Sequence, residues 1–250
     1  MRYFLKLSYN GTPFHGWQSQ PNAVSVQQTI EESLSVILCQ DTPVVGAGRT
    51  DTGVNARMMY AHFDAEPVND VRKFLLSLNR LCGPSISIED LIEVPADAHA
   101  RFDATEREYK YFAAFGKSPF LSSFSWHSPN RLDVDAMNEA AALLLEVKDF
   151  TSFAKLHSDA KTNICDVRRA DWKPWDNAYG VPGIVFTITA DRFLRNMVRA
   201  VVGTLVDVGR GKLSISDFRE IIDAKDRCSA GTSMPPQALF LWKITYPYIS

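Results

Sequence analysis

The segment GAGRTDTGVNA, residues 46–56, decides how the surrounding chain is interpreted. Its three glycines surround one arginine and one aspartate, and glycine lets a backbone approach a ligand closely or adopt a positive φ. The spacing does not match GxxxxGK[ST], so the segment is not a P-loop, and one GxG is weak support for dinucleotide binding. Beside Arg49, Asp51 is expected to stay ionised and suits a nucleophile, a general base or a counter-ion. A tight turn holding a structural Arg–Asp pair is the alternative.

Strands and helices are predicted on both sides of this segment. Val44 and Val45 lead into it, and residues 58–63 follow it as a strand. Ser25, with Gln28 three residues on, predicts a helix that begins with a capping box. Working outward, the apolar patterns predict helices over residues 25–38 and 69–82 and strands over residues 1–9 and 86–94.

The second half of the chain repeats this mixture. A helix is predicted from Asp133 or Asp135, a long helix over residues 191–208 with Gly209 just beyond its end, and a short helix capped by Ser216. Residues 172–182 are predicted to be a turn region, and strands are predicted over residues 108–115, 184–189 and 239–246. The alternation predicts an α+β protein with two halves of similar size and a boundary near residue 105.

Composition indicates a folded globular protein. Among 250 residues, 46% are hydrophobic and 22% are charged, which excludes intrinsic disorder and a fibrous repeat. Lys plus Arg is 27 and Asp plus Glu is 29, so the formal net charge is 27 − 29 = −2. The four cysteines form no CxxC motif, so we predict no metal site and expect small core residues. Without a signal-peptide pattern or a long apolar run, a soluble cytoplasmic protein with no membrane partner is expected.

Basic and aromatic residues alternate after residue 100. Arg107, Tyr109 and Tyr111 have strand spacing and therefore share one face, and Arg101 and Phe102 lie just before them. Aromatic rings beside guanidinium groups suit stacked bases and phosphates. A half-buried strand with aromatic packing would have the same pattern.

Three arginines mark the predicted long helix. Arg192, Arg195 and Arg199 are spaced by three and four residues, which places them on one helix face. Because the rest of this helix is apolar, it is predicted to be largely buried, and its arginines then need anionic partners. Solvation of the arginines, with one internal salt bridge, is the alternative.

Residues 48–54, GRTDTGV, resemble the GRTDxGV signature of the TruA family of tRNA pseudouridine synthases, which surrounds the catalytic aspartate. Further segments resemble motifs of this family in the same order along nearly the whole chain: residues 9–18, 25–27, 99–102 with 109–111, 193–199 with 203–205, and 235–241.

The resemblance implies the pseudouridine synthase fold. This is an α+β fold with two similar α/β-sandwich halves, related by a pseudo-twofold and sharing a mostly antiparallel central sheet. Residues 1–105 would form the half with the aspartate loop, and residues 106–250 the half with the tyrosine strand and the arginine helix. The family resemblance further implies a homodimer that binds the tRNA anticodon stem-loop and needs neither a small-molecule cofactor nor a metal.

The implied reaction isomerises uridine to pseudouridine on the 3′ side of the anticodon stem-loop. Asp51 would be the essential carboxylate, acting either as a nucleophile or as the base that removes the 2′ proton to give a glycal. Tyr109 would stack on the flipped uracil and act in proton transfer at C5, Arg199 would pair with Asp51, and Leu239 would form the floor of the pocket. Candidate phosphate contacts are Arg49, Arg57, Arg101 and Arg107.

The chain departs from the family pattern at Asn10, Thr52, Asn55 and Ala238, where Asp, Ala, His and Gly are usual. Two rival functions belong to other classes. An RNA-binding module without turnover would be expected to lose Asp51 or Arg199, and both are present. A glycosidic hydrolase needs two acids in one site, and the matching motifs supply only Asp51.

Overall fold

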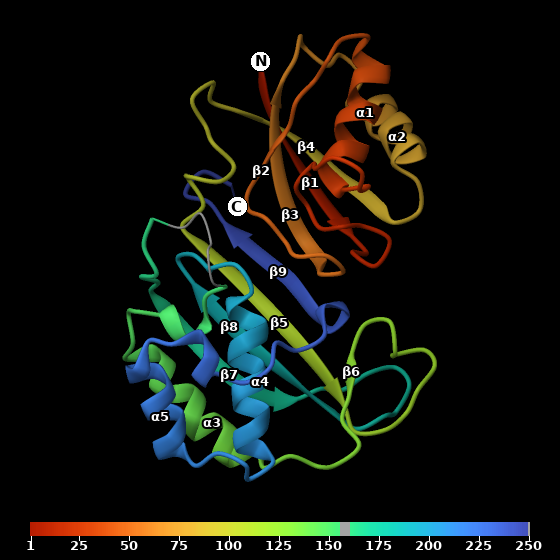
Figure 1. Cartoon of the computed structure of the whole chain (residues 1–250). Coiled ribbons are helices and arrows are strands. Elements are labelled where there is room, and N and C mark those ends of the chain that lie inside the picture. Colours follow the sequence, from red (N-terminus) through yellow and green to blue (C-terminus); the bar gives the residue numbers. More distant parts are fainter. Residues whose placement is uncertain (156–160, 250) are drawn as a thin grey trace. The chain divides into compact units, whose positions relative to one another are not determined.

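The computed structural model describes residues 1–155 and 161–249, which belong to two compact units (Figure 1). The first unit contains Met1–Thr105 and the end of the chain from Leu241, and the second contains Glu106–Phe240. The segment that begins at Leu241 therefore groups with the first unit, although the sequence pattern assigned it to the second half.

The first unit is a βαββαβ unit around an antiparallel sheet. β1 pairs with β4 on one side and with β3 on the other, and β3 also pairs with β2. Phe4, Leu5 and Leu7 of β1 are fully buried, because both faces of this central strand are covered. The elements are β1 (Arg2–Tyr9), α1 (Val26–Leu38), β2 (Val45–Gly46), β3 (Asn55–Asp64), α2 (Val71–Cys82) and β4 (Ile86–Val94).

Both helices of the first unit begin at side-chain caps. The Ser25 hydroxyl accepts a hydrogen bond from the Gln28 amide at 3.2 Å, which satisfies one of the free N–H groups of the first turn. The Gln28 side chain donates a hydrogen bond to Glu32 and accepts none from the Ser25 backbone. Only the first of the two hydrogen bonds of the predicted capping box is therefore present. Asp70 caps α2, which buries Phe74, Leu78 and Cys82.

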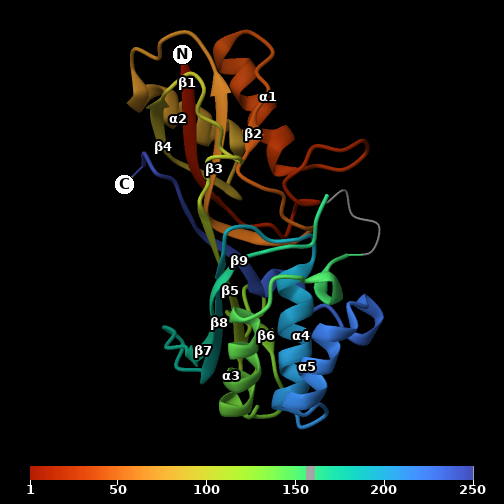
Figure 2. The same ribbon diagram turned by 90° about the vertical axis from the view of Figure 1, so that its left-hand side faces the viewer.

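In its described residues, the second unit has three α-helices against an antiparallel sheet. β8 pairs with β5 and β7, and β6 adds a short parallel pairing to β5. Figures 1 and 2 show α3, α4 and α5 gathered on one face of these strands, and the three helices contact one another. The elements are β5 (Glu106–Ala114), β6 (Trp126–His127), α3 (Val134–Ala142), β7 (Val167–Pro174), β8 (Gly183–Ala190), α4 (Met197–Gly209), α5 (Ile215–Ala224) and β9 (Leu239–Thr245), which continues into the first unit. Short 3-10 turns occupy Leu143–Leu145, Thr151–Phe153, Arg227–Ser229 and Pro236–Ala238.

The two units pair their strands in the same order. In the first unit β3 lies between β1 and β2, and in the second β8 lies between β5 and β7. If the two-residue strand β6 is left aside, a helix follows the first strand of each unit and another follows the third. The predicted α+β class and the mostly antiparallel pairing are therefore found within each unit.

Helix α4 differs from its prediction at both ends. It begins at Met197, and Asn196 before it has a left-handed backbone with φ +65°. The expected stripe of three arginines on one helix face is therefore wrong, because Arg192 and Arg195 precede the helix. The last helical residue is Gly209, which was expected just beyond the end. The predicted burial is confirmed, since nearly every residue of α4 is buried.

Other local predictions also need correction. Ser214, not Ser216, caps α5, and it forms a reciprocal capping box with Asp217. Residues 172–174, expected in a turn, end strand β7, which the sequence pattern did not reveal. Cys39 and Cys228 are exposed rather than in the core. Within the described ranges, none of the helices is long and apolar enough to span a bilayer.

The buried face of β8 provides a stability test. Phe186 is fully buried, and its ring centroid lies 5.0 Å from that of Trp172. Phe186→Ala is expected to lower the free energy of unfolding by about 3–5 kcal/mol, because it leaves a cavity in the core of the second unit. Phe120→Ala is the matched control, since Phe120 is 66% exposed, and it should change stability by less than about 1 kcal/mol in urea denaturation. Equal effects of the two variants would contradict this core assignment.

Candidate active site

Asp51 lies on a loop that is held through its backbone. The Trp17 amide donates to the Thr50 carbonyl at 3.3 Å, and the Gly53 amide donates to the Phe14 carbonyl at 3.4 Å. Within the loop, the Val54 amide donates to the Asp51 carbonyl at 3.1 Å. Asp51 itself is partly exposed between the buried residues Thr50 and Val54. Its carboxylate is therefore carried by a fixed main chain and stays within reach of solvent.

Two glycines let the loop after β1 approach the Asp51 loop. Gly16 has φ +91°, and a Cβ there would lie 2.5 Å from the Thr50 carbonyl oxygen. A Cβ at Gly11 would lie 2.1 Å from the Val54 carbonyl oxygen. A side chain at either position would force the two loops apart. The segments 9–18 and 48–54 therefore pack directly against each other through their backbones.

Asn55 ties these loops together at the start of β3. Its side chain is fully buried, and its Oδ1 accepts a hydrogen bond from the Gly11 amide at 2.8 Å. Nearby, the hydroxyl groups of Tyr9 and Thr50 are 2.9 Å apart and share a hydrogen bond. Asn55, one of the departures from the family pattern, thus has a positioning role here.

Two of the predicted phosphate-binding arginines extend from this region. Arg49 is exposed, and its Nε donates to the Gln18 side chain at 3.1 Å. Arg57 is also exposed, and its guanidinium lies 5.0 Å from the ring centroid of Trp242. Trp242 was not predicted, since no local pattern relates residues 57 and 242.

Arg101 belongs to a turn organised by two histidines. His99 Nδ1 accepts from the amides of Arg101 and Phe102 at 3.1 and 3.3 Å, and the Arg101 guanidinium lies 5.7 Å from the Phe102 ring centroid. The buried His62 accepts from the Ala100 amide through Nδ1 at 3.1 Å. Burial, followed by the charge of the nearby Arg2, lowers the pKa of His62 to about 4.

Tyr109 is a half-buried tyrosine on β5, in the second unit. It pairs in register with Ile188 of β8, and its ring meets Phe193 edge-on at 5.0 Å. Tyr111, two residues on, is fully buried, which raises the pKa of its hydroxyl, and its hydroxyl donates to the Pro235 carbonyl at 3.2 Å. Of these two tyrosines on one strand face, only Tyr109 is therefore partly exposed. Arg107 at the start of β5 donates to the Asp191 carbonyl at 2.8 Å.

Arg199 lies in the first turns of α4 and is held by the segment before β9. Its Nε donates to the Met234 carbonyl at 2.6 Å, and the Met234 amide donates to the Arg199 carbonyl at 3.1 Å. One turn on, a Cβ at Gly203 would lie 1.9 Å from the Thr232 carbonyl oxygen, so this close packing requires glycine. Leu239, at the start of β9, is 5% exposed.

Each unit thus presents part of the predicted set on rigid backbone. The first unit carries Asp51 with Arg49, Arg57 and Arg101, and the second carries Tyr109, Arg199, Leu239 and Arg107. Phe193 was expected only as an apolar residue of the long helix, so its contact with Tyr109 was not predicted. Met234 was missed, because no periodicity marks the segment before β9. Among the side chains that the structure describes, no group of three or more His, Cys, Asp or Glu could hold a metal ion.

Comparison with known proteins gives consistent matches. Residues 140–247 match the model of a family described as tRNA pseudouridine synthase. The tRNA pseudouridine synthase A of Bacteroides fragilis is 54% identical over 248 residues, which are 98% of this chain and 96% of that protein. The protein of the same name from Parabacteroides distasonis is 53% identical over 247 residues, and that from Caldicellulosiruptor bescii is 39% identical over 244 residues. These alignments cover 98% and 97% of this chain, and 96% and 98% of the respective relatives.

The Asn55 hydrogen bond predicts a measurable effect on the Asp51 loop. Asn55→Ala leaves the buried Gly11 amide without this acceptor and should lower the free energy of unfolding by about 1–3 kcal/mol. Exchange of the Gly11 amide hydrogen with deuterium should accelerate in the same variant. Asn10→Ala is the control, because Asn10 accepts from Thr12 at an exposed position and should change stability little. Unchanged Gly11 exchange in Asn55→Ala would refute the positioning role.

His62 predicts a pH dependence of stability. Its pKa is about 4 in the folded chain and about 6.5 when unfolded, so the unfolded chain gains a proton first as the pH falls. The contribution of His62 is therefore fully present above about pH 6.5 and is lost as the pH falls through 4, by up to about 3 kcal/mol. Urea denaturation from pH 7 to 4 should show a shallower fall for His62→Gln than for the wild type. The exposed His15, replaced by Gln, should leave the wild-type profile unchanged, and parallel profiles for His62→Gln and the wild type would contradict the assignment.

Proposed function

The chain belongs to the tRNA pseudouridine synthase A family and isomerises uridine to pseudouridine in tRNA, and we propose that Asp51 is the essential carboxylate and that the target uridines lie on the 3′ side of the anticodon stem-loop. The observation that carries the proposal is the Asp51 loop. Its main chain is fixed by the loop after β1, while Asp51 keeps solvent access. A carboxylate in this setting can meet an extruded nucleotide without rearrangement of the loop.

The proposed reaction exchanges one bond to the ribose for another. The C1′–N1 bond breaks, the uracil rotates, and C1′ bonds to C5, which loses its proton while N1 gains one. Asp51 serves this sequence either by attack as a nucleophile or by removal of the 2′ proton, and both routes need an ionised carboxylate. The isomerisation has no net redox change, so the proposal requires no cofactor.

We assign the uracil-binding roles to residues of the second unit. Tyr109 stacks on the flipped uracil and assists proton transfer at C5, a role that suits it better than Tyr111 because Tyr109 is partly exposed and Tyr111 is buried. Arg199 pairs with Asp51, and Leu239 forms the floor of the pocket. The hydrogen bonds that Arg199 exchanges with the Met234 backbone, through its Nε and its carbonyl, position this side chain at the start of α4.

Arg49, Arg57, Arg101 and Arg107 are proposed to contact RNA phosphates. Arg49, Arg57 and Arg101 are exposed, and Arg107 is half-buried at the start of β5. Phosphate contacts supply much of the affinity of proteins for nucleic acids, so a chain with a net charge of −2 must concentrate its cations where the tRNA binds.

The family resemblance also supports a proposal about architecture. The two units would be related by a pseudo-twofold and share one central sheet, and two chains would form a cytoplasmic homodimer on tRNA. The support within this chain is the common strand order, in which β3 lies between β1 and β2 and β8 lies between β5 and β7.

Release of tritium from C5 of uracil tests the role of Asp51. With a tRNA transcript labelled at this carbon, the wild type should release tritium to water, because the new C–C bond expels that hydrogen. Asp51→Asn and Asp51→Ala should reduce release at least about a thousandfold while they retain tRNA binding. Asp41→Asn is the matched control, since Asp41 is an exposed aspartate of the same unit, and it should keep the wild-type rate.

Three outcomes would contradict the proposal. Wild-type rates in both Asp51 variants would remove Asp51 from the reaction. Binding without release by the wild type, across several tRNA species, would indicate an RNA-binding module. Loss of the labelled uracil as a free base would indicate a hydrolase. Sequencing of the modified positions would then test the assignment to the 3′ side of the anticodon stem-loop.

A further inference from the structure

Arg192 lies in the irregular segment between β8 and α4. Its backbone amide donates to Oδ1 of Asp191 at 2.8 Å, and the same oxygen accepts from the Asp166 amide at 2.7 Å. The Asp191 carboxylate is thus occupied by main-chain donors at the ends of two neighbouring strands. This arrangement fixes the backbone at residue 192 without using the Arg192 side chain.

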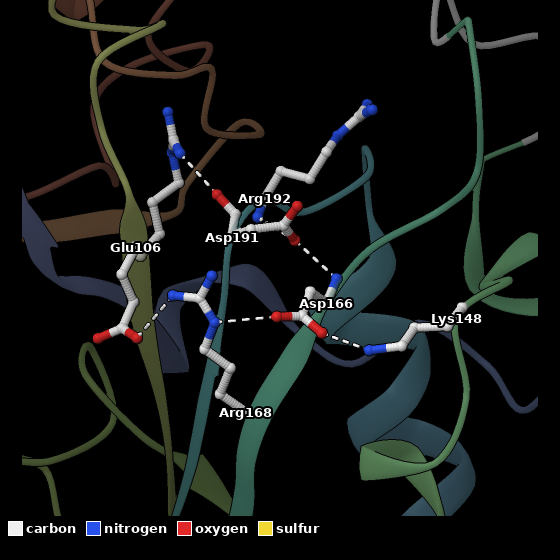
Figure 3. A network of polar contacts seen from close by, with 7 residues as sticks. Glu106, Lys148, Asp166, Arg168, Asp191 and Arg192 are labelled. Carbon is white, nitrogen blue, oxygen red and sulfur yellow. Dashed lines mark hydrogen bonds and ion pairs between the residues drawn. The ribbon is translucent and has the colours of Figure 1, made fainter.

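The acidic groups around this segment have cationic partners of their own. Asp166 pairs with Lys148 and, at 3.0 Å, with Arg168, which also contacts Glu106 at 3.1 Å. These pairs lower the pKa of Asp166 and keep it ionised. Figure 3 shows the network, in which the carboxylates of Glu106, Asp166 and Asp191 each meet a donor.

The Arg192 guanidinium extends away from this network in Figure 3. Its nitrogens form no hydrogen bond or ion pair within residues 1–155 and 161–249, and the side chain is only partly buried. Arg195, in the same segment, is exposed, and its carbonyl accepts from the Lys155 amide at 3.1 Å. Arg192 therefore presents a positive charge from a fixed backbone, with the nearby carboxylates already occupied.

Phe193, the residue after Arg192, connects the Arg192 segment to Tyr109 of the proposed uracil site. Phe193 packs edge-on against Tyr109 at 5.0 Å, so Arg192 is one residue from the support of the ring proposed to stack on uracil. Arg107 reaches the carbonyl of residue 191 at 2.8 Å, which brings a second guanidinium to the same segment. We propose that Arg192 binds a backbone phosphate of the tRNA strand beside the flipped uridine, an inference that rests on the proposed function.

Phosphate is the anion that fits these observations. A guanidinium with a fixed stem can donate two parallel hydrogen bonds to phosphate oxygens, and tRNA presents a phosphate on each side of an extruded nucleotide. The Asp191 and Asp166 network acts as a positioning element, because it holds the backbone from which Arg192 extends. Arg192 is then an RNA-binding residue rather than a catalytic one.

The test measures tRNA affinity as a function of salt. In the Asp51→Ala background, which is used to separate binding from turnover, an additional Arg192→Gln should weaken binding of a tRNA transcript about five- to tenfold in low salt. The slope of log affinity against log KCl concentration should fall by about 0.7–0.9, the value for one lost phosphate contact. Arg192→Lys retains the charge and should restore most of the slope.

Arg219→Gln is the matched control. Arg219 is an exposed arginine of α5 in the same unit, with its guanidinium 3.5 Å from Glu146, and its replacement should leave both affinity and slope unchanged. An unchanged slope in Arg192→Gln would overturn the proposal, as would an equal slope change in Arg219→Gln. The single variant Arg192→Gln, with Asp51 intact, gives a further test. If it released tritium more slowly at saturating tRNA while its affinity for tRNA was unaltered, the proposal would also be overturned. Failure of the wild type to release tritium would instead refute the proposed function.

Discussion

The close approach of two backbone segments is the constraint on which the position of Asp51 depends. Positions 11 and 16 require glycine, because the carbonyl oxygens of Val54 and Thr50 occupy the space that a Cβ would need. Asn55 then closes the contact with a buried hydrogen bond to the Gly11 amide. The main chain at Asp51 is therefore held by contacts between backbone segments, and Asp51 itself stays partly exposed.

The second unit uses the same principle at Arg199. Gly203 packs against the Thr232 carbonyl, and Met234 exchanges hydrogen bonds with both the backbone and the Nε of Arg199. Tyr109 is fixed differently, by its strand register and by a T-shaped contact with the Phe193 ring. In both units, main-chain contacts between segments distant in sequence hold the functional side chains, which explains why the family motifs include glycines and apolar residues beside the charged ones.

Prediction from sequence succeeded where the pattern is local and failed where distant segments meet. The alternation of residues 1–9 and 86–94 located β1 and β4, because period-two burial is visible within one strand. The start of α4 was misplaced, since the apolar spacing continues through residues 191–196 while Asp191 binds the Arg192 amide and Asn196 adopts a left-handed backbone. The GRTDTGV motif indicated Asp51, but the role of Asn55 required the Gly11 contact, and no periodicity reveals a contact between residues 57 and 242.

The small net charge of −2 is compatible with an RNA substrate. Whether an arginine can bind phosphate depends on whether a carboxylate already pairs with it, and not on the net charge of the chain. On β7, Arg168 and Arg169 are paired with carboxylates, so RNA would have to compete with an existing ion pair at these positions. Arg57 packs on the uncharged Trp242 ring, and the Arg192 guanidinium extends from a network whose carboxylates already have donors. Arginines such as Arg57 and Arg192 therefore keep their positive charge for a phosphate. The acidic side chains that make the net charge negative lower the affinity for RNA mainly where they lie within about 8–10 Å of the bound strand, because salt screens charges at longer distances.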